Sequence, residues 1–280
     1  RRQFGQKTRY VAQLILEGRP KIKNKHRPNL GTGVVGLDLG PSTLAAVGPS
    51  SALLELFCHA LEHPSEQIRR LQRKLERQRR ANNPDNYTAE GKIRPGKKVW
   101  HVSKAMNKTR AALRELHRKL AAHRKCLHNH LVNRLLQMGD TFRLEKLSYR
   151  SFQKNFGRSV SIRAPGTFVS RLKCKAESAG AKVEECSTYR TALSQRCHCG
   201  RKQKKPPRQR VHECCCGVYA QRDLYSAFLA RFVESNQLQV SRAALAWKET
   251  EAFLSTTWKQ AKDAKGGRRV SSFGTFRDQR

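Results

Sequence analysis

The chain has 280 residues, of which 38% are hydrophobic, enough for one main core of domain size and a small additional module. Its 58 Lys and Arg residues outnumber its 21 Asp and Glu residues, which gives a formal net charge of +37. Such a charge makes nucleic acid the expected partner, because each neutralised phosphate releases condensed counterions. No apolar run approaches the roughly 20 residues of a spanning helix and no secretory signal opens the chain, so we expect no membrane partner and a cytoplasmic location.

The N-terminal part of the chain is expected to be extended. Residues 10–17 (YVAQLILE) are apolar and β-prone, and they end at a Gly and Pro break before a basic linker that runs to about residue 27. Gly, Pro and Ser then separate short apolar runs. These runs predict three hairpin-connected strands at residues 32–40, 43–47 and 52–57.

From Ser65 the spacing of apolar residues becomes helical. Ile68, Leu71 and Leu75 form one stripe with basic residues around it, which is typical of an amphipathic helix with a basic outer face. A second, leucine-rich helix is expected at 103–138, so that the two form an αα-hairpin. The basic face is either solvated surface or a surface for nucleic-acid backbone, and we expect the latter. The residues expected to contact the backbone are Arg69, Arg70, Arg73, Lys74 and Arg77.

The second half of the chain alternates between strands and helices. Residues 141–147 (TFRLEKL) have strand character, and we expect a loop through Arg163 after them. A helix at 167–179 and a strand at 181–186 then complete a βαβ-like step. A group of cysteines and a short helix from about Gln221 follow. The remaining tail has one weak amphipathic stretch and is expected to be largely disordered.

Three carboxylates are noteworthy because acids are scarce in this chain. Asp38 lies inside the apolar run VVGLDLG, where a lone buried carboxylate would cost several kcal/mol without a cation nearby. Glu145 lies near the end of TFRLEKL, and Asp223 lies in the first turn of the helix after the cysteines. Each alone has a structural explanation, as a turn cap or a helix N-terminal acid. Their order can nevertheless bring three oxygen ligands together, and two Mg²⁺ ions held there would activate water for phosphodiester hydrolysis.

Five of the nine cysteines crowd into one short segment, which is typical of metal binding in a reducing compartment and not of a disulfide scaffold. Four of them form two CxC pairs on either side of a basic loop, and four thiolates suit one tetrahedral Zn²⁺. These four are Cys197, Cys199, Cys214 and Cys216. Alternative ligands in the segment are His198, His212 and Cys215, and reduced cysteines without metal are the alternative explanation.

Three motifs resemble those of a known nuclease family. GLDLGPSTLAAVG resembles the first RuvC motif of the TnpB family and its descendants, the type V CRISPR effectors; RLEKLS resembles the second and QRDLYSAFLA the third. The cysteine segment resembles the zinc ribbon between the second and third motifs. The resemblance covers about residues 10–232. It implies that Asp38, Glu145 and Asp223 are the catalytic acids and that Arg222, beside the last acid, belongs to the nucleic-acid contacts.

The resemblance further implies an α/β fold of the RNase H-like (RuvC) type, with a mixed sheet, an inserted helical hairpin and an inserted zinc ribbon. The implied protein is a transposon-associated, RNA-guided DNA endonuclease in the prokaryotic cytosol, close to the nucleoid. DNA and a guide RNA would be its partners, and two catalytic Mg²⁺ and one structural Zn²⁺ its metals. The implied parts are the last strand of a mostly missing N-terminal wedge barrel with a linker (1–30), a nuclease core (31–189) with its hairpin (65–138), a zinc ribbon (190–220), the last nuclease helix (221–236) and the tail (237–280).

Departures from the family leave two alternatives open. The family usually has an acid where Gln221 stands, Asn where Tyr225 stands, and CxxC in place of each CxC pair. The chain also begins at Arg1 without an initiator methionine, which suggests a fragment. The first alternative is therefore a truncated, inactive nucleic-acid-binding remnant of such a nuclease. The second is a DDE-type transposase, which shares the RNase H-like core but does not explain a cysteine cluster before the last acid.

Overall fold

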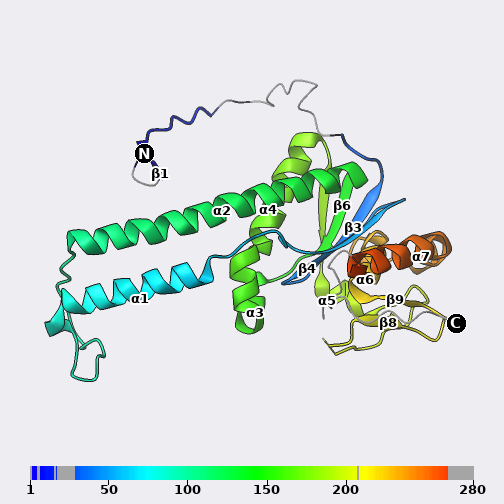
Figure 1. Ribbon diagram of the computed structural model, residues 1–280. Helices are drawn as coiled ribbons and strands as arrows, with labels where there is room; N and C mark the ends of the chain where they lie inside the picture. Colours follow the sequence, from blue (N-terminus) through cyan, green and yellow to red (C-terminus); the bar gives the residue numbers. More distant parts are fainter. Residues whose placement is uncertain (1, 5–6, 16, 18–28, 207, 264–280) are drawn as a thin grey trace. The chain divides into compact units, whose positions relative to one another are not determined.

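The computed structural model (Figure 1) describes residues 2–4, 7–15, 17, 29–206 and 208–263. The chain divides into two compact units, a smaller one of Arg1–Lys21 with Ala60–Cys126 and a larger one of Ile22–His59 with Leu127–Arg280. The long helix α2, Lys104–Met138, begins in the smaller unit and ends in the larger one. None of the helices in the described part of the chain is long and apolar enough to cross a membrane.

A five-stranded mixed sheet lies at the centre of the larger unit, with the strand order β5-β4-β3-β6-β7. The strands are β3 (Val34–Leu39), β4 (Thr43–Val47), β5 (Ala52–Leu56), β6 (Thr141–Glu145) and β7 (Lys182–Cys186). β3, β4 and β5 pair antiparallel as successive hairpins, whereas β3 pairs with β6, and β6 with β7, in parallel. The strands that the sequence predicts in this region are therefore present, with bounds shifted by a few residues.

Helices cover both faces of this sheet, so its central strands are apolar on both sides. On one face, Leu37 and Phe142 pack with the last turns of α2 and with α4 (Pro165–Ala179). On the other face, Ala45 and Val47 pack with α6 (Arg222–Ala230) and α7 (Val240–Asp263). The remaining short elements of the larger unit are α3 (Tyr149–Arg163), α5 (Thr188–Thr191), η3 (Leu193–Gln195), β8 (Val211–Glu213), β9 (Tyr219–Gln221), β10 (Val233–Glu234) and β11 (Gln237–Leu238).

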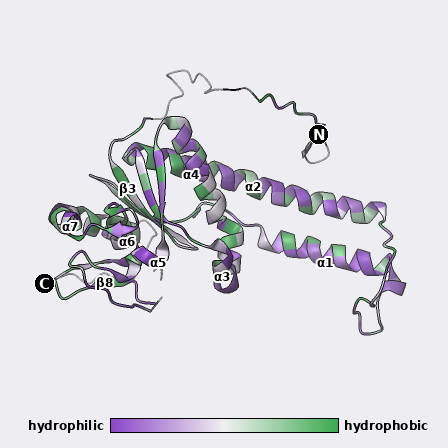
Figure 2. Cartoon of the chain, turned by 180° about the vertical axis from the view of Figure 1, so that it is seen from behind, coloured by the Kyte–Doolittle hydropathy of each residue, from purple (hydrophilic) through white to green (hydrophobic). Residues whose placement is uncertain are grey.

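The smaller unit contains the helical hairpin that the sequence predicts. It consists of α1 (Ser65–Ala81), the short η2 (Pro84–Asn86) and the first part of α2, and α1 and α2 lie side by side in both views (Figures 1 and 2). Ile68 is buried on the inner face of α1, and Met106 is buried at the start of α2. Figure 2 shows that hydrophilic residues predominate along α1, as expected of a helix with a basic outer face.

The structure corrects the strand predicted at 10–17. Residues 10–15 form no strand, and Tyr10, Leu14 and Ile15 are 81%, 84% and 88% exposed. Strand pairing occurs instead just before them, between β1 (Arg2–Phe4) and β2 (Lys7–Arg9). A β-prone run needs a partner strand and a covered face to be stable, and neither is supplied to these exposed side chains. Most of the predicted basic linker lies outside the described residues.

Two further predictions were wrong because tertiary contacts stabilise helices with weak local signals. The loop expected before Arg163 is the helix α3, which is kinked at Phe156. It is anchored by Ser159 Oγ, which donates to Pro41 O at 2.5 Å, and by Arg163 Nε, which donates to Phe57 O at 2.9 Å. The tail expected to be disordered contains α7, which buries Trp247, Leu254 and Trp258 against the rest of the core. Residues 264–280 lie outside the described part.

Candidate active site and metal centre

The carboxyl ends of β3 and β6 place Asp38 and Glu145 side by side. The two strands pair in parallel with Leu37 opposite Leu144, so Asp38 and Glu145 occupy the next position of the same register. Side chains in register on neighbouring strands point to the same face of a sheet, and residues two apart on one strand share a face. Both carboxylates therefore point to the face to which Gly36 belongs.

Gly36 determines how closely α6 approaches that face. A Cβ at Gly36 would lie 1.9 Å from Ala227 O and 2.9 Å from Arg231 N, so the helix backbone occupies the space of the missing side chain. Asp223 lies about 6 Å before Ala227 along the helix, and Asp38 lies about 6.6 Å beyond Gly36 along the strand. Arg231 Nε donates to Val34 O at 3.2 Å, so helix and strand run in opposite directions. This packing brings Asp223 to the level of Asp38.

The electrostatic surroundings of Asp38 raise its pKa. Burial raises the pKa of Asp38 well above its ordinary value, and the negative charges of Asp223 and Glu145 raise it further. The positive charge of Arg222 opposes these effects. Burial also raises the pKa of Glu145. Asp223 is buried and Asp38 and Glu145 are half-buried, so holding their negative charges together is costly without a cation or a proton.

Neighbouring hydroxyl groups orient two of these acids. Thr43 Oγ1 donates to Asp223 Oδ2 at 3.3 Å, and Thr191 Oγ1 donates to Glu145 Oε1 at 2.8 Å. The Leu193 N–H also donates to Glu145 Oε1, at 3.3 Å. Asp223 is 8% exposed and lies in the first turn of α6, where the helix dipole favours a negative charge.

The residues at the start of α6 cap the helix and place a positive charge beside Asp223. Gln221 caps α6, because its side-chain oxygen accepts the N–H of Leu224 at 2.7 Å. Arg222 Nε lies 3.8 Å from Asp223 Oδ1 and is half-buried. The arginine therefore supplies a positive charge beside the acids.

Two backbone turns of the same form present the four cysteines. The Gly200 N–H donates to Cys197 O at 3.0 Å, and the Gly217 N–H donates to Cys214 O at 3.0 Å. Both glycines have positive φ angles, 86° and 92°, which residues with a Cβ rarely adopt. The CxCG repeat in the sequence therefore encodes two equivalent turns.

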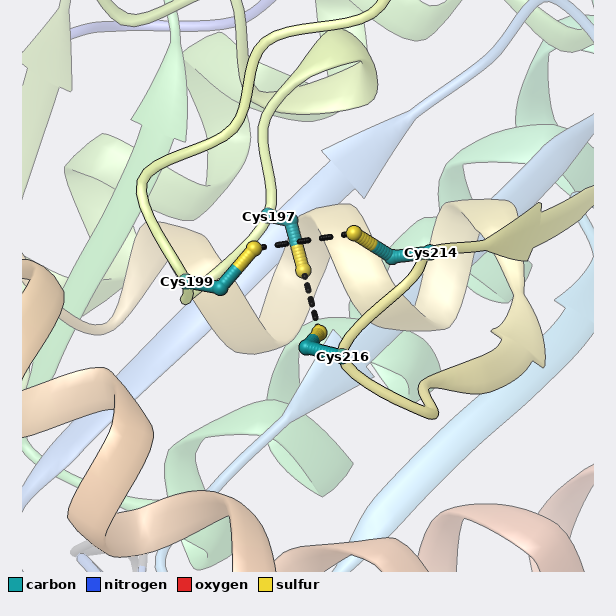
Figure 3. A group of neighbouring side chains, drawn as sticks. All are labelled: Cys197, Cys199, Cys214 and Cys216. Carbon is teal, nitrogen blue, oxygen red and sulfur yellow. Dashed lines mark hydrogen bonds between the residues drawn. The ribbon is translucent and has the colours of Figure 1, made fainter.

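The four sulfur atoms converge on one point (Figure 3), and all of them lie within 4.8 Å of one another. Cys197 Sγ lies 3.5 Å from Cys216 Sγ, and Cys199 Sγ lies 3.5 Å from Cys214 Sγ. With Zn–S bonds of about 2.3 Å, the sulfurs of a tetrahedral zinc site are about 3.8 Å apart, so the cluster fits one Zn²⁺. Among the described residues, the carboxylates form no group as tight as this one.

The alternative ligands of the cysteine segment are engaged elsewhere. Cys215 is exposed, and its sulfur accepts from Arg201 Nη1 at 3.0 Å. Nδ1 of His212 contacts Lys205 Nζ, and burial lowers the pKa of His212 to about 3, helped by the charges of Lys205 and His198. His212 is therefore neutral and packs as an aromatic ring, 4.1 Å from the centroid of Tyr225.

Tyr225 links the cysteine cluster to α6. Its hydroxyl oxygen lies 3.2 Å from Cys197 Sγ and 3.0 Å from His198 Nδ1, and it accepts the N–H of His198 at 3.0 Å. Burial raises its pKa, so the hydroxyl keeps the proton that it can donate to a thiolate. Because Tyr225 follows Asp223 by two residues, one helix connects the thiolates with a candidate catalytic acid.

Sequence reasoning missed several residues of the site. Gly36 carries a signal, since glycine inside a strand often marks close approach of another backbone. Thr43 and Thr191 have no such signal, because their roles depend on distant contacts. The Ser226 hydroxyl is buried near Asp38, whose pKa it lowers slightly, and it makes no hydrogen bond of ordinary geometry. The basic residues predicted to bind nucleic acid are exposed on α1: Arg69, Arg70, Arg73, Lys74 and Arg77.

A family model matches part of this region. Residues 166–229 match the Cas12f1-like TNB domain. The matched segment runs from α4 through β7 and the cysteine cluster into α6, and it includes Asp223. The match supports a family of the TnpB and Cas12 type for this part of the chain. No curated protein matches the chain.

Proposed function

We propose that the chain carries the nuclease site of an RNA-guided DNA endonuclease of the TnpB type. The surroundings of Asp38 are the observation that carries this proposal. The pKa of its carboxylate is raised by burial and by the negative charges of Asp223 and Glu145. It follows the register pair Leu37–Leu144, on the strand whose Gly36 packs against α6. The TNB-domain match supports a nuclease in coarse terms, since nucleases make up the TnpB and Cas12 type of family.

The arrangement of elements supports an RNase H-like core. The second strand of the sheet, β4, is antiparallel to its neighbours, and the other strands are parallel to one another. The helical hairpin follows the third strand, and the cysteine cluster precedes the last helix that contributes an acid. We expect this order of insertions in a RuvC-like nuclease with a zinc ribbon.

In the proposed mechanism, Asp38, Glu145 and Asp223 would hold two Mg²⁺ ions, which supply Lewis acidity and an activated water. Mg²⁺ keeps several of its waters, so widely spaced carboxylates suit it better than a tight cage. The threonine hydroxyls orient Asp223 Oδ2 and Glu145 Oε1. Burial and the negative charges of Asp223 and Glu145 raise the pKa of Asp38, so bound cations would favour its ionised form.

Nucleic acid would be held by charge. Arg222 supplies a positive charge beside the acids for a phosphate of the DNA. The exposed basic face of α1 would contact the backbone of guide RNA or DNA without reading sequence. One Zn²⁺ on the four cysteines would hold the segment that leads into α6.

The test is target cleavage in Mg²⁺ with a matched guide RNA, by the protein expressed from its complete reading frame. Replacing any one of Asp38, Glu145 and Asp223 with Ala should abolish cleavage and leave nucleic-acid binding nearly unchanged, and the losses should not add, because the three act as a unit. Ca²⁺ should permit binding with little turnover. The matched control is Asp140→Ala, whose carboxylate accepts only the neighbouring Thr141 hydroxyl among the described contacts.

Two outcomes discriminate between the candidate functions. Full cleavage by the Asp38→Ala protein would rule out the proposed site. An unmodified protein that binds but does not cleave, beside an equally inactive Asp38→Ala variant, would favour the inactive remnant, for which the departures at Gln221 and Tyr225 are the specific observations.

A further inference from the structure

A cavity of about 450 Å³ opens in the smaller unit between α1 and the start of α2. Its walls include Leu75 and Arg79 from α1, Trp100 and Val102 from the connecting segment, and Met106 and Arg110 from α2. The interior is mostly apolar, whereas the surrounding helices are basic. This volume lies within the range of sites for small organic groups, about 300–1,000 Å³.

The wall of the cavity contains a partly exposed aromatic side chain, Trp100, on an otherwise highly charged surface. Its side chain is 37% exposed, and Val102 next to the cavity is 41% exposed. The guanidinium of Arg79 lies over the Trp100 ring, 4.1 Å from its centroid, and Tyr87 meets the ring edge-on at 6.1 Å. An aromatic ring held in place at the mouth of an apolar hollow is a surface on which a planar group can stack.

The cavity is held open by hydrogen bonds of Asn83. The side-chain amide of this buried residue donates to Arg79 O at 2.8 Å and to His101 O at 3.0 Å, and its Oδ1 accepts the N–H of His101 at 2.5 Å. Asn83 therefore ties the end of α1 to the segment that carries Trp100. A ligand that enters a pre-formed site loses less free energy to ordering.

Charge and shape together identify the occupant. The net charge of +37 disfavours a second copy of this chain and attracts polyphosphate, and the exposed Arg110 lies at the cavity. Unpaired bases stack on aromatic rings and arginine planes, whereas bases inside a duplex are already stacked. We propose that this cavity binds an unpaired nucleotide of a nucleic-acid strand, with its base stacked on the Arg79–Trp100 pair and its phosphates near the surrounding arginines.

This inference rests on the proposed function only for the class of ligand, a nucleic acid. Base binding is measured without divalent cations and cleavage with Mg²⁺, so failure of one can be distinguished from failure of the other. The chain has three tryptophans, and Trp247 and Trp258 are only 7% and 1% exposed, so quenching of tryptophan fluorescence by a ligand reports mainly on Trp100. The probes are a short single-stranded oligothymidylate, an abasic oligonucleotide of equal length and a duplex of equal length.

The oligothymidylate should quench the fluorescence, and the abasic strand, which has the same phosphates, should not. In a binding titration with labelled strands, Trp100→Ala should weaken the affinity for oligothymidylate by about tenfold or more and leave the affinity for the abasic strand unchanged. Trp100→Phe should keep part of the preference for oligothymidylate over the abasic strand, and it replaces Trp100→Ala in the test if that variant does not fold. The control Arg69→Ala should weaken both strands equally, because it removes only a phosphate contact.

Several results would overturn the proposal. Equal quenching by the abasic strand would mean that the site binds phosphate alone, and equal quenching by the duplex would mean that it does not require an unpaired base. An unchanged affinity of the Trp100→Ala and Trp100→Phe proteins for oligothymidylate would remove Trp100 from the interface. Displacement of oligothymidylate from the cavity by an acidic peptide, with Trp100 quenching of the same size, would assign the cavity to a protein partner.

Discussion

Replacing Gly36 with Ala tests how the acids are brought together. The new Cβ would lie 1.9 Å from Ala227 O, whereas ordinary contact begins near 3.4 Å, so α6 must move away from β3 by about 1.5 Å (3.4 minus 1.9). The obstructing atoms belong to the helix backbone and cannot rotate away. Asp223 moves with the helix and Asp38 stays with the strand, so the distance between the two carboxylates changes.

This displacement should reduce function more than it reduces stability. A misplacement of about 1 Å in a catalytic site can cost about a hundredfold in rate, and overpacking costs about 1–3 kcal/mol of stability. Cleavage by Gly36→Ala should fall at least a hundredfold, and its affinity for Mn²⁺, measured by electron paramagnetic resonance, should fall as well. Binding to the abasic strand should remain, because it does not depend on the separation of the acids.

Gly157→Ala is the matched control. Gly157 lies in α3, and a Cβ built there meets no atom within 4 Å. Gly157 directly follows the kink at Phe156 and has open space around it, so this variant should be about as active and as stable as the unmodified protein. A Gly36→Ala protein with unchanged Mn²⁺ affinity and cleavage would refute the argument that α6 sets the spacing of the acids.

Four further predictions concern metal, pH and salt. Purified protein should contain about one Zn²⁺, and elemental analysis should show its loss when Cys214 and Cys216 are both replaced with Ser; zinc retained at full stoichiometry would exclude this ligand set. Tyr225→Phe should weaken retention of Zn²⁺ against a chelator by about tenfold or more, because groups bonded to a metal ligand orient it; an unchanged competition curve would mean that the hydroxyl does not act on the metal. Asp38→Asn should stabilise the metal-free protein at neutral pH. The pKa of Asp38 is raised in the folded state, so the stability of the unmodified protein falls as pH rises above the ordinary carboxyl pKa of about 3.9. In thermal denaturation, the stability gained by Asp38→Asn should therefore vanish below that pH. A gain that does not depend on pH would contradict the burial of this charge. Charge reversal on the outer face of α1 should reduce the slope of log affinity against log salt concentration by about 0.9 for each phosphate that the helix no longer neutralises, and an unchanged slope would remove α1 from the interface. The residues to reverse are Arg69, Arg73 and Arg77.

Local patterns in the sequence were sufficient for the elements whose stability depends on near neighbours. Gly, Pro and Ser between short apolar runs predicted the β3-β4-β5 hairpins, and the helical stripe that begins at Ile68 predicted α1. The four cysteines were identified from spacing alone, because each CxCG repeat forms its turn within a few residues. Asp38 could be selected as a candidate because a charge in an apolar strand is costly without a cation, and its catalytic role stays a prediction.

Contacts between distant residues decided the rest. α3 and α7 have weak local signals; hydrogen bonds of Ser159 and Arg163 to distant backbone anchor α3, and burial of Trp258 in the core stabilises α7. The apolar run at 10–15 shows the opposite case, since strand propensity without a partner strand does not produce a strand. In the site, Thr43 donates to Asp223 across 180 positions of the chain. Periodicity reports only which face of an element is apolar, and the close approach of α6 at Gly36, which aligns Asp223 with Asp38, arises when the two faces pack together.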